Sequence, residues 1–362
     1  MKFALLLKYY VLILVSISLG FFGFCEYQNL RNNYLNFNEI IDSENINQEG
    51  YLLEIYPSES FKSVLRRLRD NKIISASSHY TLYFMSKLAK HDKKIKAGEY
   101  LITRDTTGWQ LMRKIVKGQV YLHKFTIVEG TRFEQLLKSI QVSKSVKNTL
   151  SKHSCKDVLQ AMGRWDSNSF HVAECEGLFM PDTYAFPKNT TDVALLQRAY
   201  DVMQTRLDYL WDNSSRGSLK SKYEALIMAS VIEKETSLIE EMGQVSGVYH
   251  KRLKNGIPLQ ADPTVIYGLK IFNRPLTRAD LKKVSKYNTY LNKGLPPSPI
   301  ATPSVAALFA ALNPEEANNY LYFVADGTGK HIFSNSLLDH NKAIFAIKNA
   351  NNFKIVNKSE QN

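Results

Sequence analysis

Two glutamates stand two residues apart in the stretch Ser230–Ser237, which reads SVIEKETS. Residues 219–238 contain no glycine or proline, and their pattern predicts a helix. On a helix the neighbours of Glu233 are small and mostly polar. The neighbours of Glu235 are all large and apolar: Val231, Ile232, Leu238 and Ile239.

These surroundings distinguish the two acids chemically. A carboxyl group among aliphatic side chains loses solvation of its charged form, which raises its pKa and suits a general acid near neutral pH. We therefore predict that Glu235 is the catalytic residue. The alternative is that both glutamates are solvent-facing residues of an ordinary surface helix.

The composition limits the class of protein. A chain of 362 residues with 44% hydrophobic and 22% charged residues is long enough for two globular domains. Its net charge of +13 favours an anionic partner such as a nucleic acid, a membrane surface or an acidic polymer. The sequence has neither zinc-finger spacing nor the signature of an RNA-binding sheet, so no nucleic-acid partner is expected. No set of cysteines and histidines has metal-ligand spacing, and we expect no metal or other cofactor.

The N-terminus predicts a membrane anchor. Lys2 and Lys8 precede or flank an apolar run, and the 17 residues from Tyr9 to Cys25 carry no charge. Acidic residues dominate just after this run, so we expect the lysines inside and the body of the chain outside the cytoplasmic (inner) membrane, in the periplasm or its equivalent. The alternative is a signal peptide that is cleaved near Ser18–Gly20.

The rest of the chain divides into several segments. After the cytoplasmic tip and anchor (1–25) we expect a linker (26–49), a small module (50–122), a catalytic domain (123–350) and a frayed tail (351–362). In the module, strand, helix, helix and strand follow one another, an order that resembles the LysM fold of peptidoglycan-binding domains. In the second half, loops rich in proline, glycine and aromatic residues alternate with helices, which favours a loop-built cleft on a mainly helical frame. The predicted fold class is α+β.

Five stretches of the second half resemble one known family. They are EGLFMPDTY (176–184), ASVIEKET (229–236), LQADPTVIYGL (259–269), YNTYLNKGLPPSPIATP (287–303) and YLYFVADGTGKHIFSNSLLDHN (320–341). In order and spacing they are similar to the endolytic murein transglycosylases of the MltG (YceG-like) family. The resemblance implies a membrane-anchored lyase that cleaves the β-1,4 bond between N-acetylmuramic acid and N-acetylglucosamine within peptidoglycan strands and leaves a 1,6-anhydro end. It further implies a role in cell-wall synthesis and remodelling, with penicillin-binding synthases as candidate partners.

The resemblance also assigns roles to residues. In lytic transglycosylases the catalytic Glu is followed by Ser or Thr, and only Glu235, before Thr236, fits. The YNTY stretch resembles the Tyr-Asn motif that closes such sites, so Tyr287 is expected to hold the Glu235 carboxyl and Asn288 an acetamido group. Gln260 resembles the Gln that faces the sugar.

Other cleft residues carry open alternatives. Tyr290 and Tyr184 are candidates for stacking on sugar faces, the alternative being packing. Asp262 is a candidate for the cleft or, before Pro263, for the cap of a following helix.

Three other functions remain open at this point. A hydrolase would need a second carboxylate roughly 5–9.5 Å from the acid, for which Asp262, Glu176 and Asp182 are candidates. A non-catalytic wall-binding scaffold would use the LysM-like module, but the intact Glu-Thr pair argues against it. A soluble lyase of small molecules is disfavoured by the predicted anchor and by the lack of a lysine-centred cofactor motif. Sequence alone does not show whether Cys155 and Cys175 pair.

Overall fold

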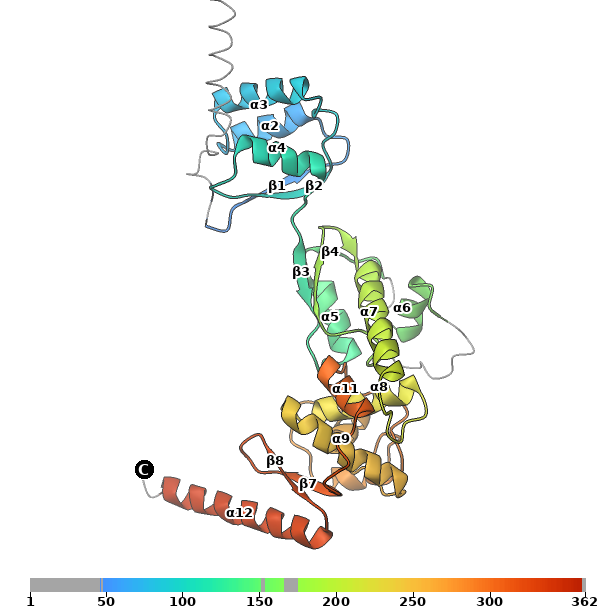
Figure 1. The fold of residues 1–362 in the computed structure, drawn as a ribbon. Coiled ribbons are helices and arrows are strands. Elements are labelled where there is room, and N and C mark those ends of the chain that lie inside the picture. Colours follow the sequence, from blue (N-terminus) through green and yellow to red (C-terminus); the bar gives the residue numbers. More distant parts are fainter. Residues whose placement is uncertain (1–45, 47, 151–153, 166–174, 360–362) are drawn as a thin grey trace, which may run out of the picture. The chain divides into compact units, whose positions relative to one another are not determined.

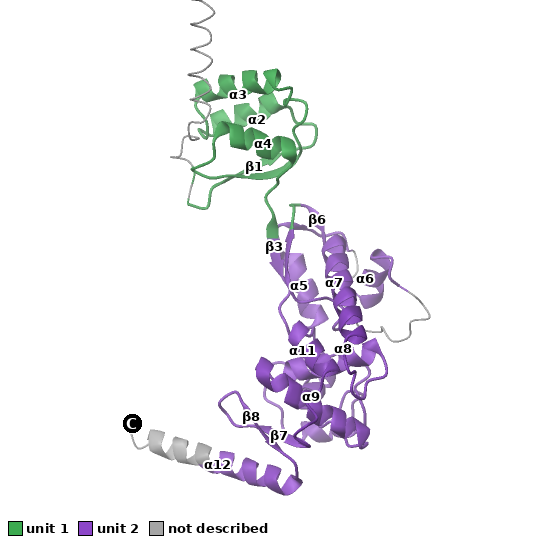
Figure 2. Ribbon diagram, in the orientation of Figure 1, with its two compact units in different colours: residues 1–123, 186–188 green, residues 124–185, 189–362 purple. Residues whose placement is uncertain are grey.

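The computed structural model describes residues 46, 48–150, 154–165 and 175–359. It divides the chain into two compact units: unit 1 comprises residues 1–123 and 186–188, and unit 2 comprises residues 124–185 and 189–362 (Figures 1 and 2). Both combine helices with two-stranded sheets, so the mixed α and β fold is as expected. The predicted anchor, residues 9–25, lies outside the described residues. Among the described residues, none of the helices has the length and apolar character needed to cross a membrane.

Unit 1 has the predicted order of strand, helix, helix and strand, followed by a further helix. Its elements are β1 (Tyr51–Ile55), α2 (Phe61–Asp70), α3 (Ala76–Leu88), β2 (Gly98–Ile102) and α4 (Gly108–Lys117). The strands β1 and β2 are antiparallel, with Tyr51 opposite Ile102 and Ile55 opposite Gly98. The Ser60 side chain accepts the backbone N–H of Ser63 and so begins α2 where the sequence pattern requires it.

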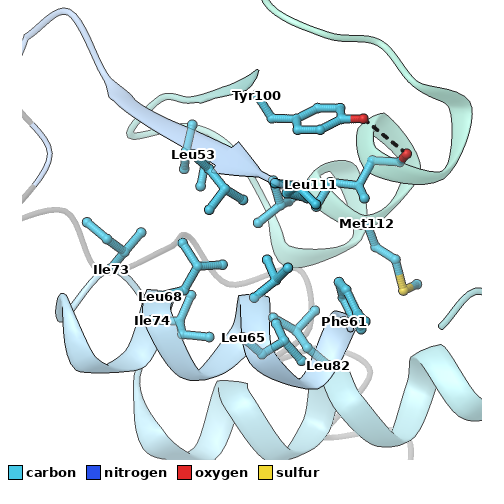
Figure 3. Packing of buried hydrophobic residues seen from close by; sticks show 14 of the residues in the cluster. Leu53, Phe61, Leu65, Leu68, Ile73, Ile74, Leu82, Tyr100, Leu111 and Met112 are labelled. Carbon is cyan, nitrogen blue, oxygen red and sulfur yellow. Dashed lines mark hydrogen bonds between the residues drawn. The ribbon is translucent and has the colours of Figure 1, made fainter. Parts of the chain in front are cut away.

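The core of unit 1 is the apolar face of α2 against the two strands and the other two helices (Figure 3). The four residues predicted to share one face of α2 are buried to 3% exposure or less: Phe61, Val64, Leu65 and Leu68. Full burial of one such side chain is worth about 1.5–3 kcal/mol. Tyr100, the largest residue of this core, donates its hydroxyl hydrogen to the Lys96 carbonyl at 2.8 Å, so its polar atom is satisfied.

Unit 2 is mainly helical. From residue 124 its helices are α5 (Phe133–Val142), α6 (Cys155–Ala161), α7 (Asp192–Asp212), α8 (Lys222–Glu235), α9 (Ile239–Lys254), α10 (Asp262–Gly268), the 3-10 turn η1 (Asp280–Lys282), α11 (Val305–Leu312) and α12 (Leu337–Ser359). Its short strands are β4 (Val146–Lys147), parallel to β6 (Thr190–Thr191), and the hairpin of β7 (Tyr322–Ala325) and β8 (His331–Ser334). A further pair joins β3 (His123–Thr126) to β5 (Thr183–Phe186).

Helix α8 forms the centre of unit 2. Every residue from Ala225 to Ile232 is buried, and α7, α9, α10 and α11 pack around it. The helix is shorter than predicted. It begins at Lys222 because the Ser221 side chain caps it, and it ends at Glu235 because Thr236 adopts an extended conformation.

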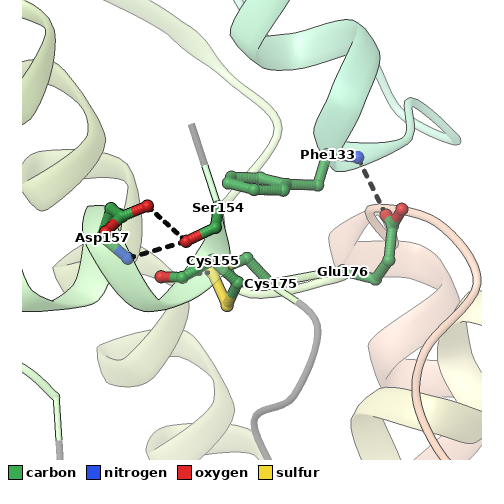
Figure 4. The surroundings of a disulfide bond; sticks show 6 residues. All are labelled: Phe133, Ser154, Cys155, Asp157, Cys175 and Glu176. Carbon is green, nitrogen blue, oxygen red and sulfur yellow. Dashed lines mark hydrogen bonds between the residues drawn. A yellow bond between two sulfur atoms is a disulfide. The ribbon is translucent and has the colours of Figure 1, made fainter. Parts of the chain in front are cut away.

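Two further features concern the sequence predictions. Cys155 and Cys175 form a disulfide, with their Cα atoms 5.2 Å apart (Figure 4). Helix α12 runs from Leu337 to Ser359 and so extends into the segment 351–362 that was predicted as a tail. The stretch from Leu337 to Ser359 contains no glycine or proline, which is consistent with an uninterrupted helix.

Candidate active site

The site is built where α8 turns into α9. Glu235 is the last residue of α8, and the chain turns through Thr236 before α9 begins at Ile239. Helix α9 then packs against α8 and brings Tyr249 to the glutamate. The Tyr249 hydroxyl donates to Oε2 of Glu235 at 3.0 Å, and Tyr249 itself is 1% exposed. This hydrogen bond fixes one oxygen of the carboxyl group.

The pKa of Glu235 is raised from 4.5 to about 7. Burial is the largest cause, and the hydrogen bond from Tyr249 acts in the opposite direction. The negative charge of Asp262 raises this pKa further, and the positive charge of Arg252 lowers it. A carboxyl group with a pKa near 7 can both give and take a proton at neutral pH.

The direction of this shift agrees with the sequence argument, but part of the predicted cause was wrong. Val231 and Ile232 are fully buried on α8, as expected. Ile239 belongs to the next helix and is 69% exposed, so it does not shield the acid in the predicted way. Tyr249 of α9, in contrast, is buried and contacts the carboxyl group directly.

Asp262 and Tyr290 form the second part of the site. The Tyr290 hydroxyl donates to Oδ1 of Asp262 at 2.6 Å, and the charges of Asp262 and Glu235 influence each other. Burial, and then this hydrogen bond, raise the pKa of Tyr290. The alternative role of Asp262 as a helix cap is not observed: Ala261 holds the cap position of α10 and Asp262 is the first helical residue.

Gln260 is connected to the site through Arg252, whose charge acts on Glu235. Gln260 has a left-handed backbone with φ of 52°, and its Oε1 accepts a hydrogen bond from Arg252 Nη1 at 3.2 Å. The same guanidinium donates to the Leu259 carbonyl at 2.7 Å and is 6% exposed, and its burial lowers the pKa of Arg252. Gln260 is thus linked to Arg252 and Tyr290 to Asp262, the two residues whose charges act on Glu235. That these residues bind substrate stays a prediction.

Three other predictions were wrong. The hydroxyl of Tyr287 lies 2.7 Å from Ser298 Oγ, and the tyrosine that holds Glu235 is Tyr249. Asn288 is fully buried, and its amide donates to the carbonyls of residues 281 and 283, so it fixes a loop and is not exposed to a sugar. Tyr184 is 2% exposed and donates to the Met180 carbonyl, which makes it a packing residue.

The remaining acids have separate contacts. Glu176 is 6% exposed and accepts the backbone N–H of Phe133 at 2.9 Å and the Tyr267 hydroxyl at 3.3 Å (Figure 4 shows the first). Glu233 accepts the backbone N–H of Ser304 at 2.9 Å, directly before α11. Glu233 therefore supports the fold, although it stands only two residues from Glu235.

Sequence reasoning missed Tyr249 and Arg252. Because they are three residues apart on α9, they share one helix face, and that spacing was the available signal. Within the described ranges, no group of three or more His, Cys, Asp or Glu side chains is arranged to hold a metal ion.

The profile of the YceG-like family matches residues 53–346. The chain belongs to this family. A relative named endolytic murein transglycosylase from Bacillus subtilis (strain 168) is 27% identical over 304 residues, which cover 80% of this chain and 83% of the relative. A protein of the same name from Streptococcus pneumoniae (strain R6) is 27% identical over 283 residues, 70% of this chain and 51% of that one. A solved structure of a yceG-like protein from Listeria monocytogenes matches with a TM-score of 0.51 and 28% identity, covering 82% of this chain and 99% of that one.

Proposed function

We propose that this chain is an endolytic peptidoglycan lytic transglycosylase that uses Glu235 as its single acid and base. It would cleave the β-1,4 bond between N-acetylmuramic acid and N-acetylglucosamine inside glycan strands. The observation that carries the proposal is a partly buried glutamate with a pKa of about 7 at the end of the central helix of a YceG-like chain. Two relatives with the name of this activity support it.

The reaction needs one group that exchanges a proton twice. Protonated Glu235 gives its proton to the glycosidic oxygen while the bond from that oxygen to C1 of the muramic acid breaks, and C1 becomes oxocarbenium-like. Ionised Glu235 then takes the proton of the C6 hydroxyl as its oxygen bonds to C1. The product is a 1,6-anhydro ring, and no water is consumed. An internal nucleophile gains a large proximity advantage over solvent water.

The neighbours of Glu235 support both halves of this cycle. Tyr249 stabilises the carboxylate form by its hydrogen bond, and Arg252 stabilises the same form by its charge. Asp262 and burial favour the protonated form. The balance keeps the pKa near neutrality, where neither proton transfer is strongly uphill.

A hydrolase of the same bond is the second candidate, because Asp262 is close enough for its charge to act on Glu235. In that case Asp262 would act as the nucleophile or activate a water molecule. The mass of the released ends separates the two reactions. Purified glycan strands incubated with the full chain should give anhydro ends, which are lighter by one water than hydrolysed ends. Hydrolysed ends alone would contradict the transglycosylase.

We also propose that residues 50–122 form a LysM-like module that binds glycan. The support is the order of its elements. The antiparallel strands β1 and β2 precede and follow α2 and α3 in the sequence, as in the LysM fold. Co-sedimentation with insoluble peptidoglycan tests this proposal. The full chain should sediment more than a variant without residues 50–122, and equal sedimentation would contradict it.

We further propose that residues 9–25 anchor the chain in the cytoplasmic membrane with the body outside. A reporter that is active only outside the membrane, fused after Gln48, should be active; a silent fusion, or mature protein free of the membrane fraction, would contradict this. Peptidoglycan synthases act on the same side, and we propose them as partners. They should co-purify with the detergent-solubilised chain, and their absence would contradict the partnership.

A further inference from the structure

A pocket of about 490 Å³ lies within unit 2, at the opposite end of α10 from Asp262. The start of α5, the disulfide and the end of α10 form its walls. Figure 4 shows part of this wall, where Glu176 lies next to the disulfide and accepts the N–H of Phe133. None of the chemistry described above uses this pocket.

The charge of the pocket is positive. Its lining contains Arg132, Lys270 and Lys286 against only two acids, Glu134 and Glu176. Both acids are already engaged. Glu134 bonds Lys138 at 2.7 Å and lies 3.6 Å from Arg132, and Glu176 accepts the two hydrogen bonds from Phe133 and Tyr267.

The two lysines differ from these paired groups. Both are exposed, and over the described part of the chain the side chain of neither Lys270 nor Lys286 has a hydrogen bond or an ion pair within 4 Å. The charge of Lys270 acts on Glu134 at a longer distance and contributes to lowering the pKa of that acid. An ammonium group needs no partner in water, but two of them at one pocket attract an anion. The aromatic residues Phe133 and Phe272 add apolar surface to the same pocket.

Helix α10 sets the distance between this pocket and the acid. Its first residue is Asp262, which acts on Glu235, and its last residue, Gly268, lines the pocket. At 1.5 Å per residue, these two residues are about 9 Å apart along the helix axis. An extended peptide covers up to about 3.3–3.6 Å per residue, so a peptide of three or more residues on a sugar bound near Asp262 covers this length.

We propose that this pocket binds a carboxylate of the stem peptide carried by the muramic acid. The proposal rests on the proposed function and names the part of the substrate that the lysines recognise. In an intact strand the lactyl carboxyl of muramic acid is in an amide bond, so the sugars are neutral. The carboxylates belong to the peptide, whose alanine methyl groups match the apolar surface of Phe133 and Phe272.

Steady-state kinetics of the full chain on three substrates test this assignment. The substrates are peptide-bearing strands, the same strands with their peptide carboxylates amidated, and strands stripped by an amidase, which keep only the lactyl carboxylate at the ring. For Lys270→Ala with Lys286→Ala, KM on peptide-bearing strands should rise roughly fivefold with kcat unchanged, as expected for two exposed charge pairs. On the other two substrates the variant and the wild type should have the same KM.

A matched control removes the same charge elsewhere. Lys282 and Lys293 are exposed and do not line the pocket, so Lys282→Ala with Lys293→Ala should leave KM unchanged on all three substrates. Lys270→Arg with Lys286→Arg should retain the wild-type KM. An equal rise in KM on all three substrates, or no rise on peptide-bearing strands, would overturn the assignment. If the wild type forms no anhydro ends on any substrate, the proposed function itself fails.

Discussion

The interiors of the two units differ in what they bury. The core of unit 1 is a set of hydrophobic side chains in which the hydroxyl of Tyr100 finds a backbone carbonyl. The interior around α8 in unit 2 also buries Ser230, His250 and Arg252. Burial of polar groups is unfavourable unless each is hydrogen-bonded, and here each is bonded to the backbone.

This difference separates unit 1, whose interior serves stability, from unit 2, whose interior also serves the proposed chemistry. In unit 1 the burial of apolar surface accounts for most of the fold, and its buried acid Glu99 is ion-paired with Lys188 and His123. In unit 2 burial, helped by the charge of Asp262, raises the pKa of Glu235 to about 7, while Tyr249 and Arg252 act in the opposite direction. Groups whose pKa is displaced by burial and by a specific charge partner are characteristic of functional sites. Variants of each region should therefore fail in different ways.

The largest expected effect is on activity in unit 2. Glu235→Gln keeps the shape of the side chain but cannot transfer a proton, so kcat should fall by about 10²–10⁴-fold or more. The measurement is the release of anhydro ends from purified strands. The matched control is Glu233→Gln, which affects only a contact to the Ser304 backbone and should retain most activity. The reverse result would show that Glu233 is the acid.

A core variant of unit 1 should change stability instead. Leu65 is fully buried, so Leu65→Ala should lower the free energy of unfolding of unit 1 by about 2–5 kcal/mol. Calorimetry measures this change. Leu88→Ala is the control, because Leu88 is 62% exposed and its loss should change that free energy by less than about 0.5 kcal/mol. Below the unfolding temperature, Leu65→Ala should retain the wild-type kcat. A fall in kcat as large as that of Glu235→Gln would contradict the assignment of stability to unit 1 and chemistry to unit 2.

The raised pKa of Glu235 predicts a pH-dependent stability of unit 2. The fold favours the neutral carboxyl, so this contribution is complete below pH 4.5 and is lost as the pH rises to about 7. The shift corresponds to about 3 kcal/mol. Glu235→Gln, which stays neutral, should become more stable than the wild type by up to this amount between pH 4.5 and 7.5. Thermal unfolding as a function of pH measures the difference, and Leu88→Ala should show no such trend.

The smallest expected effect separates two tyrosines. The hydrogen bond of Tyr249 lowers the pKa of Glu235, so Tyr249→Phe should move the alkaline limb of the pH–rate profile upward by roughly one pH unit. Activity falls on that limb because Glu235 loses the proton it must donate. Tyr287→Phe removes a hydroxyl that contacts Ser298 and should leave the limb in place. A shift for Tyr287 and none for Tyr249 would reverse the assignment.

Much of the local structure could be predicted from the sequence, and much of the site could not. The apolar spacing of α2 and the strand–helix–helix–strand order of unit 1 follow from hydrophobic periodicity, and the structure confirms both. The end of α8 was placed three residues too late, because Thr236 and Leu238 fit either a helix or an extended turn. The shortest strands, β4 and β6, have only two residues each and give no periodic signal.

The sequence by itself determined the chemistry of Glu235. Its identity, its position before Thr236 and two buried neighbours on α8 are local properties, and they set the direction of the pKa shift. Only the tertiary structure decided which groups surround it. Tyr249 is 14 residues away and Asp262 is 27 residues away, and a helix hairpin and a loop bring them together. Local spacing cannot rank Tyr249 above Tyr287, because a hydrogen bond depends on where the packing of α9 against α8 places each hydroxyl.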